Sequence, residues 1–500
     1  MTKILPEEFI QQTQELMGEE MFAQLSDAIC HSEPPTSIRL NRFKAPQGTH
    51  LADNSSTDAE AEVKTHHESE KSEKAAASIV PWCPDYGRYL TERPNFTFDP
   101  LFHAGLYYAQ EASSMFVDLV VRQLIHEPVV MLDLCAAPGG KSTAVRNVLP
   151  DGSLLISNEP MRTRAQILAE NMQKFGHPDV IVTNNYPKDF QKAGVLFDVI
   201  LADVPCSGEG MFRKDETARS EWSKANVENC VQRQRDILRT IWPTLRKGGY
   251  IIYSTCTFNR REDEENVLFI ANELGAEIIN LETDADWHIC GDTTGRNLPV
   301  YHFFPHKTRG EGFFLALLKK TSDTPPAENR KSKKKKPETV SADGFAEWIN
   351  CKENFDFHKS KDGITALRKA FADDYAAISE KLNVICAGVR VCTEKPAKFS
   401  NSARKPKPQF VPAPGLALSS CLNRKAFPDI SLNYSDAIKF LRGESIPLTV
   451  YAPRGWVTVS YRNLPLGFAN NVGSRLNNSY PPAWRIRSTY VPDSAPQLEF

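Results

Sequence analysis

Two cysteines follow apolar, strand-like runs in similar settings. Cys206 stands in LADVPCSGEG, shortly after Asp203 ends one such run, and Cys256 stands at the end of YIIYSTC. A single cysteine at the end of a strand is more often a small buried residue than a nucleophile, because free cysteines are among the most buried residues. Two cysteines that converge on one cofactor cleft would favour a reactive thiol instead.

A third motif has the composition of a cofactor loop. In LDLCAAPGGKST an apolar run is followed by Cys135, Ala136, Ala137, Pro138, Gly139, Gly140 and Lys141. The small residues let the backbone approach a ligand closely, but the spacing matches neither GxGxxG nor a Walker loop, which disfavours a dinucleotide or a triphosphate. Glu159, at the end of the next apolar run, is placed to bind a ribose diol. S-adenosylmethionine, a nucleoside cofactor without a pyrophosphate, fits these features best.

Two charged residues each allow two interpretations. Lys141 falls where a helix should begin, the unfavourable end for a cation, so it is either a tolerated exposed lysine or a functional one. Asp203 is either a salt-bridged structural acid or a carboxylate that binds an amino donor on a ligand.

Two charged segments follow the cysteines. Glu209, Arg213 and Lys214 lie in a glycine-containing loop, as expected of a flexible segment that faces phosphates. The run NRREDEENV after Cys256 is predicted to be the solvated face of a helix, which adds nothing to the case for the thiol.

Together these residue types suit methylation of a pyrimidine at C5. A thiolate that adds to C6 turns C5 into an enamine carbon, which can take a methyl group from a sulfonium donor. A carboxylate at the N3/N4 edge of the base stabilises the charge that develops, and a base then removes the C5 proton. The cysteine needs a lowered pKa, which a nearby cation such as Lys141 could supply.

Alternating strand and helix patterns from about residue 128 to 320 predict the elements that position these residues. The apolar strands indicate a doubly wound, Rossmann-like α/β domain with a parallel sheet covered on both faces. Residues 227–247 are predicted to form one long helix that two glycines stop. The first, fourth and fifth strands should be adjacent, so that both cysteines flank one crevice at the carboxyl ends of the strands.

Composition sets further bounds. A chain of 500 residues is too long for a single core. Its net charge of −2 means that a nucleic acid would have to be held by local basic patches. No apolar stretch is long enough to span a bilayer and no secretion signal opens the chain, so a cytoplasmic location is expected. The eleven cysteines show no CxxC pair and no zinc spacing, which argues against a metal site or a disulfide framework.

The motifs, taken in order, resemble those of the Sun/Fmu-type RNA cytosine-C5 methyltransferases. The resemblance rests on LDLCAAPGGKST, NEPMRTRAQILAENMQKFG, LADVPCSGEGMFRK and STCTFN, and it continues in SIRLNRFK, WCPDYG, YYAQEASSM and LPLGFANNVGSRLNNSYPPAWRIR. The set is most similar to the RsmF subgroup, which modifies small-subunit ribosomal RNA. It covers nearly the whole chain apart from residues 45–79 and a lysine-rich linker.

The resemblance implies roles for these residues. The loop from Cys135 to Lys141 would line the S-adenosylmethionine site, with Glu159 on the ribose and Asp203 on cofactor and target base. Family members often carry an acid near the adenine, and Asn185 is its nearest match here. In the RNA enzymes of this family the Thr-Cys cysteine is the nucleophile.

For the two cysteines the resemblance decides what residue physics leaves open. It implies that Cys256 attacks C6 and that Cys206 helps to release the product. In cytosine DNA methyltransferases the Pro-Cys cysteine attacks instead, so the position after a strand does not by itself choose between them.

Five segments follow from composition and resemblance. They are an N-terminal RNA-recognition domain at residues 1–100 with a disordered insertion at 45–79, a methyltransferase domain at 101–320, a basic linker at 321–340, a first C-terminal domain at 341–412, and a PUA-like RNA-binding domain at 413–500. The α+β N-terminal domain and the β-rich C-terminal end flank the central sheet. Four C-terminal aromatic residues are mostly expected in a small core: Trp456, Tyr461, Tyr480 and Trp484.

The leading hypothesis is formation of 5-methylcytosine in small-subunit ribosomal RNA through a covalent adduct with Cys256. The same chemistry on transfer RNA is an alternative on which the motifs are silent. A non-catalytic RNA-binding assembly factor is a second alternative, against which both cysteines, Lys141 and Asp203 argue. The expected partner is RNA, as ribosomal RNA or the small ribosomal subunit, with no membrane, no metal and a monomeric chain.

Overall fold

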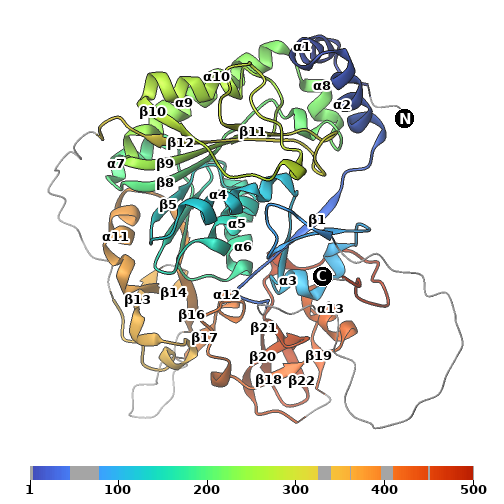
Figure 1. Ribbon diagram of the computed structural model, residues 1–500. Helices are drawn as coiled ribbons and strands as arrows, with labels where there is room; N and C mark the ends of the chain where they lie inside the picture. Colours follow the sequence, from blue (N-terminus) through green and yellow to red (C-terminus); the bar gives the residue numbers. More distant parts are fainter. Residues whose placement is uncertain are drawn as a thin grey trace, which may run out of the picture.

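The computed structural model describes residues 4–45, 78–324, 339–360, 362–395, 409–448 and 451–498. Most of the predicted insertion and of the predicted basic linker lies outside these ranges. Figure 1 shows a central sheet between helices, with α1 (Glu7–Met17) and α2 (Glu19–His31) at one end of the molecule and the C-terminal part at the other. Within the described ranges, no helix is both long and apolar enough to cross a bilayer.

Five parallel strands form the centre of the sheet. They are β5 (Val130–Asp133), β6 (Leu154–Asn158), β7 (Val180–Thr183), β8 (Phe197–Asp203) and β9 (Leu245–Thr255). Over the described residues the strand order is β10–β12–β9–β8–β5–β6–β7–β15, with β11 paired to β12. The outer strands β10 (Ala276–Ile279), β11 (Val300–Phe303), β12 (Phe313–Lys320) and β15 (Val384–Ala387) are antiparallel to their neighbours. This confirms the predicted doubly wound class and the adjacency of β5, β8 and β9.

Helices cover both faces of the sheet. On one face lie α4 (Phe116–Leu124), α5 (Gly140–Val148) and α6 (Arg162–Phe175), and on the other lie α7 (Pro187–Ala193), α9 (Lys224–Ile241), α10 (Glu264–Phe269) and α11 (Ala372–Lys381). Neighbouring strand residues alternate between the two cores, as Met131 and Leu132 do. Because both faces are buried, the polar residues of a site are confined to the strand ends.

The long helix predicted at residues 227–247 ends earlier than expected. It is α9, and it stops at Ile241 because Pro243 has no N–H with which to continue the helix. A short 3₁₀ turn, η4 (Trp242–Thr244), leads directly into β9. The two glycines lie inside that strand and do not terminate the helix.

A small sheet from the N-terminal part lies against the central α/β domain, where Arg39 donates to Thr143 Oγ1. Its strands are β2 (Ser78–Ile79), β3 (Gly87–Leu90), β1 (Thr36–Leu40) and β4 (Tyr107–Ala109), hydrogen-bonded in that order. β4 lies beyond residue 100, so this sheet extends past the predicted domain boundary.

The C-terminal part contains two more sheets. The first is β13 (Phe355–Ser360), β14 (Gly363–Arg368), β16 (Val389–Lys395) and β17 (Gln409–Pro412), and the second is β18 (Asp429–Ser431), β20 (Gly455–Tyr461), β21 (Leu464–Asn471), β22 (Arg475–Asn478) and β19 (Ile446–Pro447). Short helices α12 (Pro414–Ala417) and α13 (Tyr434–Arg442) accompany them. Between β14 and β16 the chain leaves to add β15 to the edge of the central sheet.

The two ends of the chain share one apolar core. Ile38 of β1 and Leu101 of α3 (Pro100–His103) belong to the same cluster as Phe440 of α13. The four C-terminal aromatic residues lie within or against such clusters, with Tyr461 and Tyr480 buried, which confirms the expectation of a core role.

Candidate active site

Cys206 and Cys256 lie side by side at the carboxyl ends of β8 and β9. Their Sγ atoms are 3.1 Å apart, and the backbone N–H of Cys256 donates to Cys206 Sγ at 3.4 Å. The predicted convergence is therefore confirmed. The hydrogen bond with Cys256, together with burial, raises the pKa of Cys206 well above its usual value, so this thiol stays protonated near neutral pH.

Lys141 and Asp203 form an ion pair next to the cysteines. Lys141 Nζ donates to Asp203 Oδ2 at 2.9 Å, and Ser254 Oγ donates to Asp203 Oδ1 at 2.8 Å. Burial alone would lower the pKa of Lys141, but Asp203, with a smaller effect from Cys256, raises it above the usual value. The lysine at the start of α5 is thus a paired, largely buried cation that holds the carboxylate in place.

The predicted cofactor loop connects β5 to α5. Gly139 has a φ of 116°, and a Cβ there would lie 3.3 Å from Leu168 Cδ1, so the turn favours glycine. Asp133, at the tip of β5, is fully buried, and its Oδ1 has no hydrogen-bond partner in the described structure. Burial raises the pKa of Asp133 to about 7. A buried free acceptor beside a loop of small residues fits a polar nucleoside cofactor.

A cleft of about 410 Å³ contains the cysteines, the ion pair and most of this loop. The predicted residues that line it are Cys135, Ala136, Ala137, Pro138, Gly140, Lys141, Asp203, Cys206 and Cys256. Tyr108, Gln110 and Glu111 form a further wall, which comes from β4 and the residues after it. No group of three or more potential metal ligands gathers in the described part of the chain.

Glu159 and Asn185 lie outside the lining of this cleft. Glu159 is buried, its Oε1 accepts from Met161 N at 2.8 Å, and its Oε2 lies 3.4 Å from Arg164 Nη1. Asn185 Oδ1 accepts from Asn383 N at 2.9 Å. The Asn185 oxygen predicted to lie near an adenine is therefore engaged by the segment before β15.

Two buried glutamates join the loops that carry the cysteines. Glu209, after Cys206, accepts a hydrogen bond from Phe258 N at 2.7 Å, and Glu262, after Cys256, accepts one from Ser207 N at 3.0 Å. Asn259 Nδ2 donates to both glutamates, at 3.0 Å and 2.9 Å. Each loop therefore holds the other. We call Glu209, Asn259 and Glu262 the glutamate clasp.

Donors from α9 and the preceding turn complete the clasp. Gln234 Nε2 donates to Glu262 Oε2 at 2.7 Å, and Trp222 Nε1 donates to Glu209 Oε1 at 3.1 Å. Burial, and next the neighbouring Glu262, raise the pKa of Glu209 to about 7. Burial also raises the pKa of Glu262.

The prediction that NRREDEENV is the solvated face of a helix is wrong for most of its length. Asn259, Glu262, Asp263 and Glu264 are at most 3% exposed. Asp263 Oδ1 accepts from Thr255 Oγ1 at 2.6 Å, at the end of β9. The loop after Cys206 is likewise anchored by buried Glu209 and is not the free segment that its glycines predicted. Side-chain and backbone donors from other segments offset the cost of burying these carboxylates.

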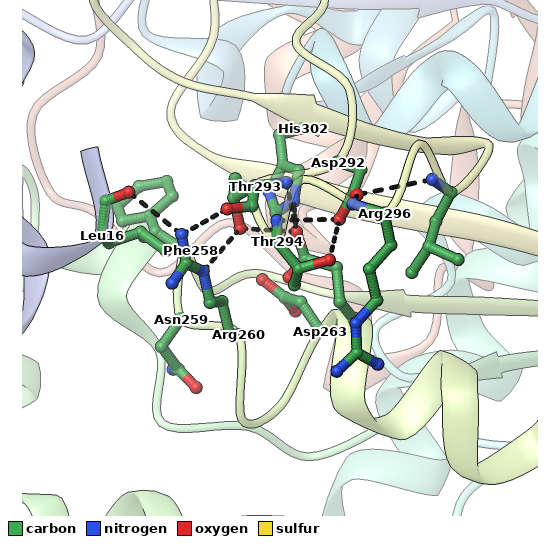
Figure 2. A network of polar contacts seen from close by, with 12 residues as sticks. Leu16, Phe258, Asn259, Arg260, Asp263, Asp292, Thr293, Thr294, Arg296 and His302 are labelled. Carbon is green, nitrogen blue, oxygen red and sulfur yellow. Dashed lines mark hydrogen bonds and ion pairs between the residues drawn. The ribbon is translucent and has the colours of Figure 1, made fainter.

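Figure 2 shows the polar network on the other side of the charged run, around Arg260 and Thr293. Glu264 Oε1 accepts from Thr293 N at 2.8 Å and lies 3.0 Å from His302 Nε2. Burial acts to raise the pKa of Glu264, but these partners lower it to about 2. Arg260 donates to Leu16 O at 3.2 Å and to the Thr293 carbonyl, so the run is also tied to α1.

The sequence carried one faint signal for these missed residues. The acids at 262–264 stand shortly before the apolar run VLFI at residues 267–270, with Glu265 and Asn266 between them, so a helix that begins there must turn some of its first residues inward. The neighbouring sequence does not indicate which of these acids will be hydrogen-bonded in the interior. The donors to Glu262, Ser207 and Gln234, lie 55 and 28 residues away from it in the chain.

Comparison with known proteins gives matches along most of the chain. The family profile described as 16S rRNA methyltransferase RsmB/F matches residues 124–319, the profile of the RsmF N-terminal domain matches 58–112, and that of the RsmF PUA domain matches 427–486. The ribosomal RNA small subunit methyltransferase F of Shewanella loihica is 30% identical over 80% of this chain and 82% of its own.

The chain belongs to the RsmF methyltransferase family. A second member, from Enterobacter sp. (strain 638), is 28% identical over 95% of both chains. Membership confirms the resemblance seen in the motifs. It also confirms S-adenosylmethionine, the cofactor expected from the loop, as the methyl donor of the family.

Solved structures agree on the fold. NSun6 from Pyrococcus horikoshii, solved with SFG, has a TM-score of 0.52 at 20% identity and covers 64% of this chain and all of its own. A methyltransferase homologue from the same organism has a TM-score of 0.51 at 23% identity and covers 63% of this chain and 95% of its own. Both therefore share the Rossmann-like methyltransferase architecture of the RsmF-type chain.

Proposed function

We propose that the protein forms 5-methylcytosine in 16S ribosomal RNA through a covalent bond between Cys256 Sγ and C6 of the target base. The observation that carries this proposal is the contact of the two thiols at 3.1 Å beside the Lys141–Asp203 pair. S-adenosylmethionine, when bound, supplies a methyl group on a positively charged sulfur. The substrate class is supported by the names of the RsmF relatives.

In this mechanism Cys256 is the nucleophile. Its thiolate adds to C6, and the C5=C6 electron pair becomes available at C5 to take the methyl group. Lys141 stays protonated because of its ion pair with Asp203, so a positive charge lies beside the attacking sulfur. Asp203, held by Lys141 and Ser254, orients the N3/N4 edge of the base and stabilises the charge that develops there.

Cys206 acts in the second half of the reaction. A base takes the C5 proton, the C–H electron pair re-forms the C5=C6 bond, and Cys256 leaves as a thiolate. The raised pKa of Cys206 keeps its thiol protonated, so it can donate a hydrogen bond to the leaving sulfur 3.1 Å away.

The remaining groups bind cofactor and RNA. Cys135 to Lys141 and the free Asp133 oxygen hold the cofactor, Glu159 binds its ribose, and Asn185 lies near its adenine. The N-terminal sheet and the PUA-like end contact RNA. The target cytosine must leave any helix to expose C5 and C6.

Two substitutions test the proposal. Cys256→Ala should abolish methyl transfer while S-adenosylmethionine still binds, and Cys206→Ala should accumulate a covalent protein–RNA adduct that survives denaturing gel electrophoresis. Wild-type turnover by Cys206→Ala with adduct in Cys256→Ala would mean that the roles are exchanged. Parallel assays on 16S ribosomal RNA, 30S subunits and transfer RNA define the substrate. Binding without transfer to any of them would favour an assembly factor.

A further inference from the structure

A second groove, of about 530 Å³, opens beside the active-site cleft. Four cations line it: Arg93, Arg213, Lys214 and Arg309. One acid, Glu33, lines it as well. The walls come from four segments, which are those after α2 and after β3, the loop after Cys206, and the connection between β11 and β12. Such an excess of cations indicates an anionic ligand.

Arg213 is a buried cation that has an unpaired hydrogen-bond donor. It is 6% exposed, its Nη1 donates to Gly310 O at 3.3 Å, and its Nε has no partner in the described structure. Among the described residues, no carboxylate lies at ion-pair distance from Arg213. Glu311, Glu111 and Glu33 act on it only from longer range, and Glu311 is paired with Lys214. Burying a guanidinium without an ion partner is costly, and an anion in the groove would offset that cost.

Arg309 is exposed but held in a fixed orientation. Its Cζ lies 4.3 Å from the centroid of the Tyr89 ring, its Nη1 donates to Ser78 Oγ at 2.7 Å, and its carbonyl accepts from Tyr89 OH at 2.7 Å. Stacking on a ring leaves the other guanidinium N–H groups available in one plane, the geometry that suits a phosphate. Within the described ranges, neither Arg309 nor Arg93 has a carboxylate at ion-pair distance.

The groove is continuous with the cleft. Lys214 lines both, and Gly310 of the groove is followed by Glu311 and Gly312 of the cleft. A polynucleotide whose target base enters the cleft therefore leaves along the groove. A free anion would need no such connection.

We propose that this groove binds a backbone phosphate of the RNA next to the target nucleotide, with Arg213 and Arg309 as its ligands. The inference rests on the proposed function, because it takes RNA as the substrate. It assigns to this groove the positioning of the strand, whereas the chemistry stays in the cleft.

The first test measures RNA binding over a series of salt concentrations for wild type, Arg309→Gln and Arg213→Gln. Each substitution should weaken RNA binding roughly tenfold. It should also reduce the slope of log affinity against log salt by about 0.7, the value for one phosphate of a single strand. The single-turnover methylation rate at saturating RNA should fall by a smaller factor than the affinity, since neither arginine touches the reacting atoms.

Arg246→Gln is the matched control. Arg246 is half-exposed, pairs with Asp198 at 3.4 Å, and lies at the start of β9, at the opposite end of the parallel strands from the cleft. The Arg246→Gln substitution removes the same charge as the two test variants, and it should leave the RNA affinity and the slope of log affinity against log salt unchanged. Thermal unfolding and S-adenosylmethionine binding of each variant separate a folding defect from a lost contact. Arg309→Gln is the decisive variant, because its exposed side chain can be replaced without disturbing a core.

A second test locates the phosphate. RNA substrates that carry one uncharged methylphosphonate linkage on either side of the target nucleotide are bound to wild type and to Arg309→Gln. At one linkage the neutral substitution should weaken wild-type binding about tenfold and have little further effect on Arg309→Gln. Additive losses at every linkage, or equal salt slopes for Arg309→Gln and Arg246→Gln, would overturn the proposal. Absence of methyl transfer by wild type would count against the proposed function alone, since binding is measured independently.

Discussion

The two sides of the active-site cleft are held in place in different ways, one by backbone conformation and the other by buried side chains. On the cofactor side, a turn of small residues with Gly139 at positive φ shapes the cleft largely with backbone. On the cysteine side, the glutamate clasp and Asp263 fix the two reactive loops with buried side chains. A backbone-built site depends on local conformation, whereas a site built on buried carboxylates depends on partners from distant parts of the chain. The two sides should therefore fail in different ways when they are altered.

The largest effect is expected from Glu262→Ala. The substitution leaves Ser207 N without its acceptor and removes a partner of Gln234 and Asn259, so the free energy of unfolding should fall by about 3 kcal/mol. The rate of adduct formation with RNA should fall about 100-fold or more, with S-adenosylmethionine affinity within about threefold of wild type. Calorimetric unfolding and quenched single-turnover assays measure the two quantities.

Glu265→Ala is the control for that prediction, because Glu265 belongs to the same run but is partly exposed and pairs with Arg261. It should cost no more than about 0.5 kcal/mol and leave the rate unchanged. Equal losses in the two variants would contradict a special role for the clasp.

The raised pKa of Glu209 predicts a pH dependence of stability. Between its ordinary pKa of 4.5 and about 7, the unfolded chain loses this proton while the folded protein keeps it, so the contribution of Glu209 to stability falls as pH rises and is constant above pH 7. The free-energy difference between Glu209→Gln and wild type should therefore shift in favour of the variant by up to about 3 kcal/mol from pH 4.5 to 7. Urea unfolding at several pH values measures this shift, and a flat difference would contradict a protonated Glu209.

A smaller effect is expected on the cofactor side from Gly139→Ala. An alanine at this position is strained by the positive φ, and its Cβ would press against Leu168, so the loop must shift. S-adenosylmethionine binding should therefore weaken roughly tenfold. Adduct formation should stay close to wild type when it is assayed at saturating cofactor. Titration calorimetry measures the cofactor affinity, and the single-turnover assay measures the rate of adduct formation. A lower rate with unchanged cofactor affinity would contradict the proposed difference between the two sides of the cleft.

The smallest effect is expected from Arg260→Gln, at the outer end of the charged run. It removes the hydrogen bonds to Leu16 and Thr293, which should cost about 1 kcal/mol and loosen α1. Hydrogen exchange of α1 amides should increase, whereas cofactor binding should not change. Exchange confined to the cofactor loop would show that the network of Figure 2 serves a different purpose.

The predictable parts of the molecule are those with local causes. The glycine turn, the apolar strands and the order of β5, β8 and β9 follow from residues that are neighbours in sequence or from general rules of parallel sheets. The early end of α9 could have been predicted from Pro243, which outweighs the glycines after it.

The parts that could not be predicted depend on distant partners. From the sequence alone, Glu262 would be interpreted as a surface acid, but in the structure it accepts hydrogen bonds from Ser207 and Gln234. Arg213 would likewise be interpreted as an exposed loop cation, but it is buried and donates to the Gly310 carbonyl. The addition of β15 to β7 joins segments about 200 residues apart, for which neither segment carries a local signal. Burial of a charged residue is decided by the donors that surround it and not by its own type.

The strand β15 limits where this chain can be divided. A fragment that ends at residue 320 would retain every residue proposed for the chemistry, yet it would leave the backbone of β7 unpaired along an apolar edge. Such an edge is a template for pairing between copies, so the excised fragment should aggregate at concentrations where the full chain does not. During synthesis, too, the sheet stays open until the ribosome has passed residue 387, and a shortened product would lack both the PUA domain and a closed sheet.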